Sequence, residues 1–283
     1  MKMPSVSFRK ILRYFIYFLL IFVAAITLTI LFSGDSDYQG TIDENIVNDS
    51  TQLNPIHVTK VVQPKSVTDI VSAIQSTNGI ISIGGGRYSM GGQTAIEQSL
   101  HLDMRQYNKV VSFSSEKREI TVESGITWRD IQQHIDTHDL SVKIMQTYAN
   151  FTVGGSMSVN VHGRYICHGP LISSIKSFNI VLADGSTKEA SPTKNTELYY
   201  SAIGGYGGIG VITEVTLLLD TNEKVERKTF AMDFKDYKNH FFKQIRDNKK
   251  VIFHNADLYP PEYDSVRDVS WYTTDKDVTI DER

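Results

Sequence analysis

The chain has 283 residues, of which 41% are hydrophobic and 22% are charged, as is ordinary for a globular protein of one large domain or two smaller ones. Its formal net charge of −3 gives no support for a nucleic-acid-binding protein. The single cysteine, Cys167, excludes an intrachain disulfide and a cysteine-based zinc site, and we interpret it as a small buried hydrophobe.

The first predicted element is a membrane-spanning helix. Residues 14–32 read YFIYFLLIFVAAITLTILF without a charge, and about 20 such residues span a bilayer core. Four Lys or Arg residues precede this run, which places residues 1–13 in the cytoplasm and the rest of the chain outside. A buried core helix and a cleaved signal peptide are the alternatives, but no typical cleavage site follows the run. We therefore expect a single-pass anchor over residues 14–33 and a polar tether over residues 34–55.

The folded part is predicted to begin near Ile56. A strand over residues 57–66 precedes a helix over residues 66–77 with Ser66 as its N-cap, and a second strand follows over residues 79–83. Three short strands at hairpin spacing are expected over residues 99–104, 109–115 and 118–124. Thr127 then caps a helix whose inner face carries Trp128, Ile131 and Ile135. This order predicts a mixed α+β fold.

Two glycine-rich segments interrupt these elements. The first, ISIGGGRYSMGGQT over residues 81–94, follows a strand, and the second, FTVGGSMSVNVHGR over residues 151–164, surrounds a glycine pair with small polar groups. Such glycines serve either tight turns alone or a bare backbone whose N–H groups close around an anion. Together, the two loops could hold the two ends of one extended phosphate-containing ligand.

A third glycine pattern, G-x-G-x-x-G over residues 205–210, fits a dinucleotide fingerprint. In a nicotinamide-type fold this pattern follows a strand and opens a helix. Here a helix over residues 196–203 precedes it and a strand over residues 211–220 follows it, so the order is inverted. The pattern therefore argues against such a site.

The last part of the chain changes character after Asn222. A strand over residues 225–234, a helix over residues 236–248 and a strand over residues 250–259 are expected. Tyr237, Phe241 and Ile245 form the inner face of that helix.

Several of these blocks, in this order, carry a resemblance to a known family. ISIGGGRYSMGGQ, ITVESGITWRDI, TVGGSMSVNVHGR and LYYSAIGGYGGIGVITEVTL are similar to the FAD-binding domain of the vanillyl-alcohol oxidase superfamily, also called PCMH-type. The nearest members are sugar and aldonolactone oxidases and proteins like decaprenylphosphoryl-ribose oxidase. The resemblance covers residues 56–222 and implies two α+β subdomains with FAD between them. Residues 223–283 would then be the truncated start of a substrate domain built on an antiparallel sheet.

The resemblance also implies a set of site residues and no metal ion. The first loop would wrap the FAD pyrophosphate, the second segment would run along the flavin, and residues 210 and 211 would approach the cofactor. The implied cofactor-binding residues are Gly84, Gly85, Gly86, Arg87, Tyr88, Ser89, Met90, Gly92, Gln93, Thr152, Gly154, Gly155, Ser156, Ser158, Val161, Gly163, Gly210 and Val211.

Two residues receive chemical roles from the same comparison. Many relatives carry a covalently flavinylated histidine where this chain has Tyr88, so we predict non-covalent FAD. His162 matches a histidine near the flavin ring, where it would act as a general base or only hydrogen-bond the cofactor. His168 is expected to be structural or solvent-facing.

The resulting prediction is a membrane-anchored FAD-dependent oxidoreductase. It would oxidise an alcohol carbon of a sugar, polyol or aldonolactone by hydride transfer to flavin N5 and pass electrons to an unspecified acceptor. The alternative is a fragment that acts only as a membrane-tethered flavin-binding module without turnover.

Overall fold

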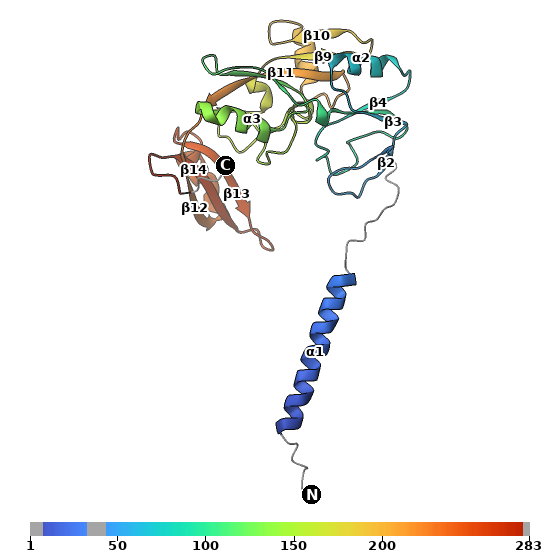
Figure 1. Ribbon diagram of the computed structural model, residues 1–283. Coiled ribbons are helices and arrows are strands. Elements are labelled where there is room, and N and C mark those ends of the chain that lie inside the picture. Colours follow the sequence, from blue (N-terminus) through green and yellow to red (C-terminus); the bar gives the residue numbers. More distant parts are fainter. Residues whose placement is uncertain (1–7, 33–43, 280–283) are drawn as a thin grey trace. The chain divides into compact units, whose positions relative to one another are not determined.

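The computed structural model describes residues 8–32 and 44–279, which fall into two units that divide between Asp43 and Glu44 (Figure 1). The first unit contains helix α1, Phe8–Phe32. The second unit contains every other element. Residues 1–7 of the predicted cytoplasmic segment and residues 34–43 of the predicted tether lie outside the described residues.

Helix α1 covers the apolar run, and those of its side chains that the structure describes are exposed, between Tyr14 and Thr27. Within residues 8–32 and 44–279, no helix combines the length and the apolar character that crossing a membrane requires. The structure therefore does not support the transmembrane helix predicted over residues 14–33.

The second unit contains a three-stranded parallel sheet in the order β3-β5-β4. Its strands are β3, Lys60–Val62, β4, Ile81–Gly84, and β5, Leu100–Asp103, and helix α2, Val67–Gln75, connects β3 to β4. The predicted N-cap is confirmed, because Ser66 Oγ accepts a hydrogen bond of 3.1 Å from the N–H of Asp69. The hairpin predicted for β5 is wrong, since β5 pairs in parallel with both neighbours. All four β5 residues are buried, as is usual for a parallel strand covered on both faces.

A larger antiparallel sheet holds the strands in the order β10-β9-β11-β7-β6, with β8 also paired to β11. Helices α3, α4 and α5 accompany it, with short 3₁₀ turns η1, η2 and η3. The bounds are β6 Val110–Ser114, β7 Glu119–Glu123, β8 Leu140–Val142, β9 Ile175–Val181, β10 Thr187–Ala190, β11 Val211–Thr221, α3 Trp128–Ile135, α4 Val153–Ser158, α5 Thr196–Ala202, η1 Met104–Gln106, η2 Asp136–His138 and η3 Leu171–Ser174.

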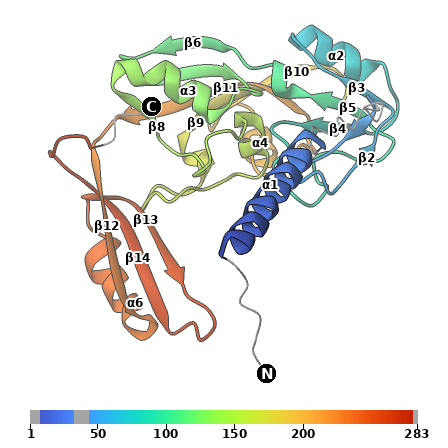
Figure 2. The ribbon, with the colours of Figure 1, turned by 60° about the horizontal axis from the view of Figure 1, so that its bottom comes forward.

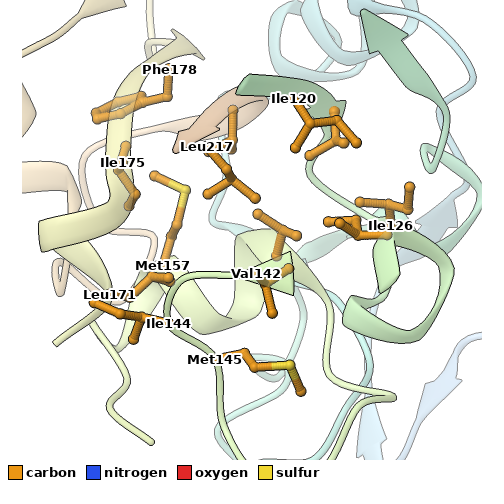
Figure 3. Close-up of a cluster of buried hydrophobic side chains, with 14 of the residues drawn as sticks. Ile120, Ile126, Val142, Ile144, Met145, Met157, Leu171, Ile175, Phe178 and Leu217 are labelled. Carbon is orange, nitrogen blue, oxygen red and sulfur yellow. The ribbon is translucent and has the colours of Figure 1, made fainter. Parts of the chain in front are cut away.

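The main hydrophobic core lies against this sheet. The predicted inner face of α3 is confirmed, because Trp128, Ile131 and Ile135 are fully buried. Thr127 and Asp130 form a capping box at the start of α3, which satisfies two N–H groups that the first turn leaves unpaired. Figure 3 shows Met157 of α4 in one cluster of buried side chains with strand residues such as Leu217 and Ile175. Helix α4 is thereby fixed to the sheet.

The tether prediction is wrong for residues 44–55. Strand β1, Ile46–Val47, pairs with β2, Ile56–His57, and Val47 is fully buried. The polar residues between them form a turn around Asp49, which is 1% exposed and accepts hydrogen bonds from Thr51 and Asn54. The side chain of Asp49 thus organises a loop whose composition resembles that of a linker.

The C-terminal part forms a three-stranded antiparallel sheet in the order β12-β14-β13 (Figure 2). The strands are β12, Val225–Asp233, β13, Val251–Leu258, and β14, Ser265–Thr273. Helix α6, Phe234–His240, continues as a π-helical turn, Phe241–Ile245, and contacts β12 and β14. The predicted strand–helix–strand order is confirmed and Ile245 is buried, whereas β14 was not predicted.

Cys167 is exposed, so its interpretation as a buried hydrophobe is wrong. It lies in a loop with a φ of 63°. Its Sγ lies 3.4 Å from the main-chain oxygen of Arg246.

Candidate active site

A cavity of about 590 Å³ lies where the two glycine segments meet. The end of β4 and the following loop form one wall, and α4 forms another. Of the predicted cofactor-binding residues, those that line the cavity are Gly84, Gly85, Gly86, Arg87, Tyr88, Ser89, Met90, Gln93, Thr152, Gly154, Gly155, Ser156, Ser158 and Gly210. The fold therefore brings together segments that are about seventy to one hundred and twenty residues apart in the sequence.

Four predicted residues do not line this cavity. Gly92, with a φ of 77°, donates its N–H to Asp49 at 3.4 Å. Val161 packs against the main core, and Val211 is buried under the parallel sheet. A Cβ atom on Gly163 would lie 2.2 Å from the carbonyl oxygen of Met145, so this glycine permits a close approach of two chain segments.

His162, the predicted catalytic residue, is exposed and is not among the residues that line the cavity. Its Nδ1 lies 3.3 Å from the carbonyl oxygen of Gly163. His168 is half-buried beside the Tyr165 ring, with the ring centroids 5.8 Å apart.

The first glycine loop is held by close packing. A Cβ atom on Gly84 would lie 2.6 Å from Nε2 of His101, and one on Gly85 would lie 2.2 Å from Oγ1 of Thr152. None of the three consecutive glycines has a positive φ; the left-handed residue is Arg87, with a φ of 60°. The missing side chains of Gly84 and Gly85 therefore leave room for neighbouring residues of the protein. This requirement is separate from the need to bring the backbone close to a ligand.

The same loop presents a row of free main-chain donors. The N–H groups of residues 86–90 find no hydrogen-bond acceptor within the described parts of the chain. These residues line the cavity, and Arg87 adds a cation to them. Successive N–H groups around a left-handed residue form a concave site for anions. This loop can therefore hold a phosphate group.

The second glycine-rich segment, residues 151–164, lines the cavity in a different way from the first loop. Instead of the expected loop, it forms helix α4, and Thr152 is the N-cap. The N–H groups of residues 153–156 already donate to neighbouring oxygens, including a 2.7 Å bond from Gly154 to the carbonyl of Ser124. Helix α4 therefore supplies a close-packed wall of small residues, while the first loop supplies free donors.

An ion-pair network lies beneath the first loop. Asp103 is 1% exposed and accepts from Arg87 at 3.0 Å and from Arg105 at 2.8 and 2.6 Å. Burial would raise the pKa of Asp103, but hydrogen bonds and charges of Arg105 and then Arg87 lower it overall. Burial, and then the charge of Arg87, lowers the pKa of His101 to about 4, so this imidazole is neutral at physiological pH.

Tyr88 and Phe151 line the cavity and belong to one cluster of aromatic rings with Tyr148. Tyr88 makes edge contacts with Tyr148 and Phe151, with ring centroids 5.3 and 4.9 Å apart. A hydrogen bond with Tyr148, followed by burial, raises the pKa of the Tyr88 phenol. Tyr88 is therefore a neutral, packed side chain at the position for which the sequence predicts non-covalent FAD.

Gln146, Tyr206 and Gly207 line the cavity but were not predicted as site residues from the sequence. Gln146 is held by hydrogen bonds to its Oε1, from Nε1 of Trp128 at 3.2 Å and from Oγ of Ser156 at 2.7 Å. Tyr206 and Gly207 line the cavity from within the inverted G-x-G-x-x-G pattern. That pattern could have indicated a cofactor-facing turn even though its order excludes a nicotinamide-type fold.

Residues 58–191 match the family model described as FAD binding domain. The chain carries an FAD-binding domain of the PCMH type. FAD is its cofactor, and the resemblance inferred from the glycine segments is confirmed.

Curated relatives extend this comparison. L-gulonolactone oxidase of Bos taurus is 26% identical over 215 residues, covering 70% of this chain and 49% of the relative. L-galactono-1,4-lactone dehydrogenase 1, mitochondrial, of Oryza sativa subsp. japonica is 25% identical, covering 79% and 38%. Cytokinin dehydrogenase 2 of Arabidopsis thaliana is 28% identical, covering 62% and 36%. The chain thus spans between about a third and a half of the length of these relatives.

The residues of the FAD-binding domain fit the cofactor physically. The free donors of residues 86–90 match phosphate oxygens, which only accept hydrogen bonds. Two buried polar atoms of cavity-lining residues, Nε of Arg87 and Oγ1 of Thr94, have no partner in the described part of the chain. Because buried polar groups are normally paired, these atoms indicate a polar ligand.

Proposed function

We propose that the protein is an FAD-dependent oxidoreductase that oxidises an alcohol carbon of a sugar, polyol or aldonolactone. The observation that carries the proposal is the row of free N–H groups on residues 86–90, in a cavity that also includes α4. The names of the lactone oxidase and lactone dehydrogenase relatives support the substrate class.

FAD, when bound, supplies the capacity to accept a hydride. The chain's own contribution begins with the first loop, whose N–H groups and Arg87 would hold the pyrophosphate. The wall formed by Thr152, Gly154 and Gly155 would pack along the cofactor and exclude water from that side. Gln146, oriented by Trp128 and Ser156, would present its amide N–H groups to the cavity.

His162 retains its proposed role as a general base or a cofactor-positioning residue. Its imidazole is exposed and could contact a ligand. This exposure is compatible with a general base and with a positioning residue alike. Tyr88 supports non-covalent binding, because a phenol packed between two rings replaces the histidine that forms the covalent bond in relatives.

Membrane attachment is a separate proposal that rests on the sequence alone. Residues 14–32 carry no charge, and cations precede them. Washing membranes that contain the full chain with alkaline carbonate tests it. We expect retention in the membrane pellet, and release into the supernatant would contradict the proposal.

Purification of the full chain tests the oxidoreductase proposal. We expect a yellow protein whose flavin is released by acid precipitation and whose absorbance bleaches on anaerobic mixing with a panel of sugars, polyols and aldonolactones. A yellow acid pellet would contradict non-covalent binding. If FAD is bound but no member of the panel bleaches its absorbance, the result would favour the alternative of a flavin-binding module without turnover. A protein that takes up no FAD would contradict both the oxidoreductase and the flavin-binding module.

A further inference from the structure

A second, smaller cavity of about 230 Å³ shares a wall with the FAD cavity. Gln146 lines both. The remaining lining comes from α3, from the loops after β8 and α4, and from strands β13 and β14. A ligand in the second cavity would therefore lie beside one bound in the first.

Three aromatic side chains form one side of the second cavity. The Tyr165 and Phe253 rings meet edge to face at 4.8 Å, and Phe253 meets Trp271 in the same way at 6.2 Å. The volume is below the roughly 300 Å³ at the small end of drug-sized pockets, so it suits a single small ring. Flat aromatic walls suit the apolar face of such a ring.

Main-chain hydrogen bonds fix this arrangement. The N–H of Ile166 donates to the carbonyl of Ile252 at 3.1 Å, and the N–H of His254 donates to the carbonyl of Arg164 at 2.9 Å. The loop thus continues the sheet beyond β13 and places Arg164 and Tyr165 opposite Phe253 and Trp271. Because these bonds use only backbone atoms, the Arg164 side chain can change without releasing the loop.

Arg164 is the only charged residue among the described residues that line the second cavity. Its guanidinium lies 5.6 Å from the centre of the Trp271 ring, and no carboxylate of the described chain lies within 4 Å of it. A guanidinium binds a carboxylate through two parallel hydrogen bonds. Gln146 adds an amide whose N–H groups find no acceptor in the same described residues.

We propose that the second cavity binds the substrate and that this substrate is a single sugar ring bearing a carboxylate, held by Arg164 against Phe253 and Trp271. The proposal rests on the oxidoreductase function proposed above and narrows its substrate class to acidic sugars. Arg164 is thereby a specificity-determining residue. Gln146 would bind the substrate at the border with the FAD cavity.

Tryptophan emission of the full chain tests the proposal, because Trp128 is fully buried and Trp271 lines the cavity. D-Glucuronate and D-galacturonate are the probes, and D-glucose and D-galactose are their neutral counterparts. We expect quenching by the acids at concentrations at least tenfold below those needed for the neutral sugars. Trp271→Phe should remove this signal.

Two arginine variants complete the test. Arg164→Gln should weaken binding of the acids by roughly 10–100-fold, the usual effect of losing a charged hydrogen-bond partner. Arg227→Gln is the matched control, because Arg227 lies 5.8 Å from the centre of the same Trp271 ring but does not line the cavity. We expect the control to bind the acids like the unmodified protein.

Three results would overturn the proposal: equal binding of acidic and neutral sugars, no binding of either acid, or equal losses in the two arginine variants. The FAD content of each preparation is measured in parallel by flavin absorbance. A normal FAD content with any of these results rejects the substrate class alone. A lack of FAD uptake rejects the proposed oxidoreductase instead.

Discussion

A side chain at position 85 would collide with Thr152, because a Cβ atom on Gly85 would lie 2.2 Å from Oγ1 of Thr152. This contact joins the first glycine loop to the N-cap of α4. The two walls of the 590 Å³ cavity therefore approach closely at Gly85, where the missing side chain leaves room for Thr152.

Gly85→Ala should accordingly separate the loop from α4. We expect a lower melting temperature, corresponding to about 1–3 kcal/mol for overpacking, and a lower FAD content after purification. Gly79→Ala is the control, because its nearest neighbour is the Thr77 hydroxyl at 3.2 Å, outside the cavity. The double variant Gly85→Ala with Thr152→Ala should lose less stability than the two single changes predict together. Additive losses would refute the contact.

His101 should make the stability of the protein depend on pH. Burial, and then the charge of Arg87, lowers its pKa from 6.5 to about 4 in the folded protein. The stabilisation is complete above pH 6.5, where the imidazole is neutral in both states, and it is lost as the pH falls towards 4, because the unfolded chain takes up the proton first. The full loss amounts to about 3 kcal/mol. Urea unfolding at pH 7.5 and pH 4.5 measures it, and His101→Asn should flatten the difference.

Arg87 and Arg105 share Asp103 but should differ in their effect on FAD. Arg87 lines the cavity and Arg105 does not, although both bind the same buried carboxylate. Arg87→Met and Arg105→Met should each destabilise the protein by about 1–3 kcal/mol. Only Arg87→Met should also weaken FAD binding, which titration of the apoprotein with FAD measures. Equal FAD affinities in the two variants would show that Arg87 serves stability alone.

His162→Ala should leave the melting temperature unchanged, because the side chain is exposed and, within residues 8–32 and 44–279, its hydrogen-bond contact is with the carbonyl oxygen of neighbouring Gly163. If His162 acts as a general base, flavin bleaching by a substrate should slow by about 10²–10⁴-fold. His168→Ala is the control for the same loop. Unchanged bleaching in both variants would mean that another residue takes up the proton.

Local signals in the sequence predicted much of the fold. Ser66 and Thr127 begin helices α2 and α3 because their side chains satisfy N–H groups that a helix start leaves free. The glycine segments indicated which stretches would meet at a site, and the cavity contains both. These features depend on neighbours within a few residues, so they are visible without a structure.

Features that depend on residues distant in the sequence could not be predicted from local sequence patterns. Strand β5 resembles a hairpin strand, but it lies between β3 and β4 in the sheet and pairs in parallel with both. Helix α4 contains two glycines, which disfavour a helix, yet the Thr152 cap and the burial of Val153 and Met157 outweigh that cost. Gln146 carries no motif, because its place at the border of two cavities follows from Trp128 and Ser156, ten and more residues away.

The pairing of the loop at Arg164 with β13 has a mechanical consequence. Strands β12, β14 and β13 are joined by hydrogen-bond ladders, of which the β13–β14 ladder shifts register between Val251 and Phe253, and the loop adds to the β13 edge. The sheet and the loop therefore form one hydrogen-bonded unit, which Gly163 connects to the segment that follows α4. A movement of the C-terminal sheet would therefore also move the backbone that follows α4, next to the 590 Å³ cavity.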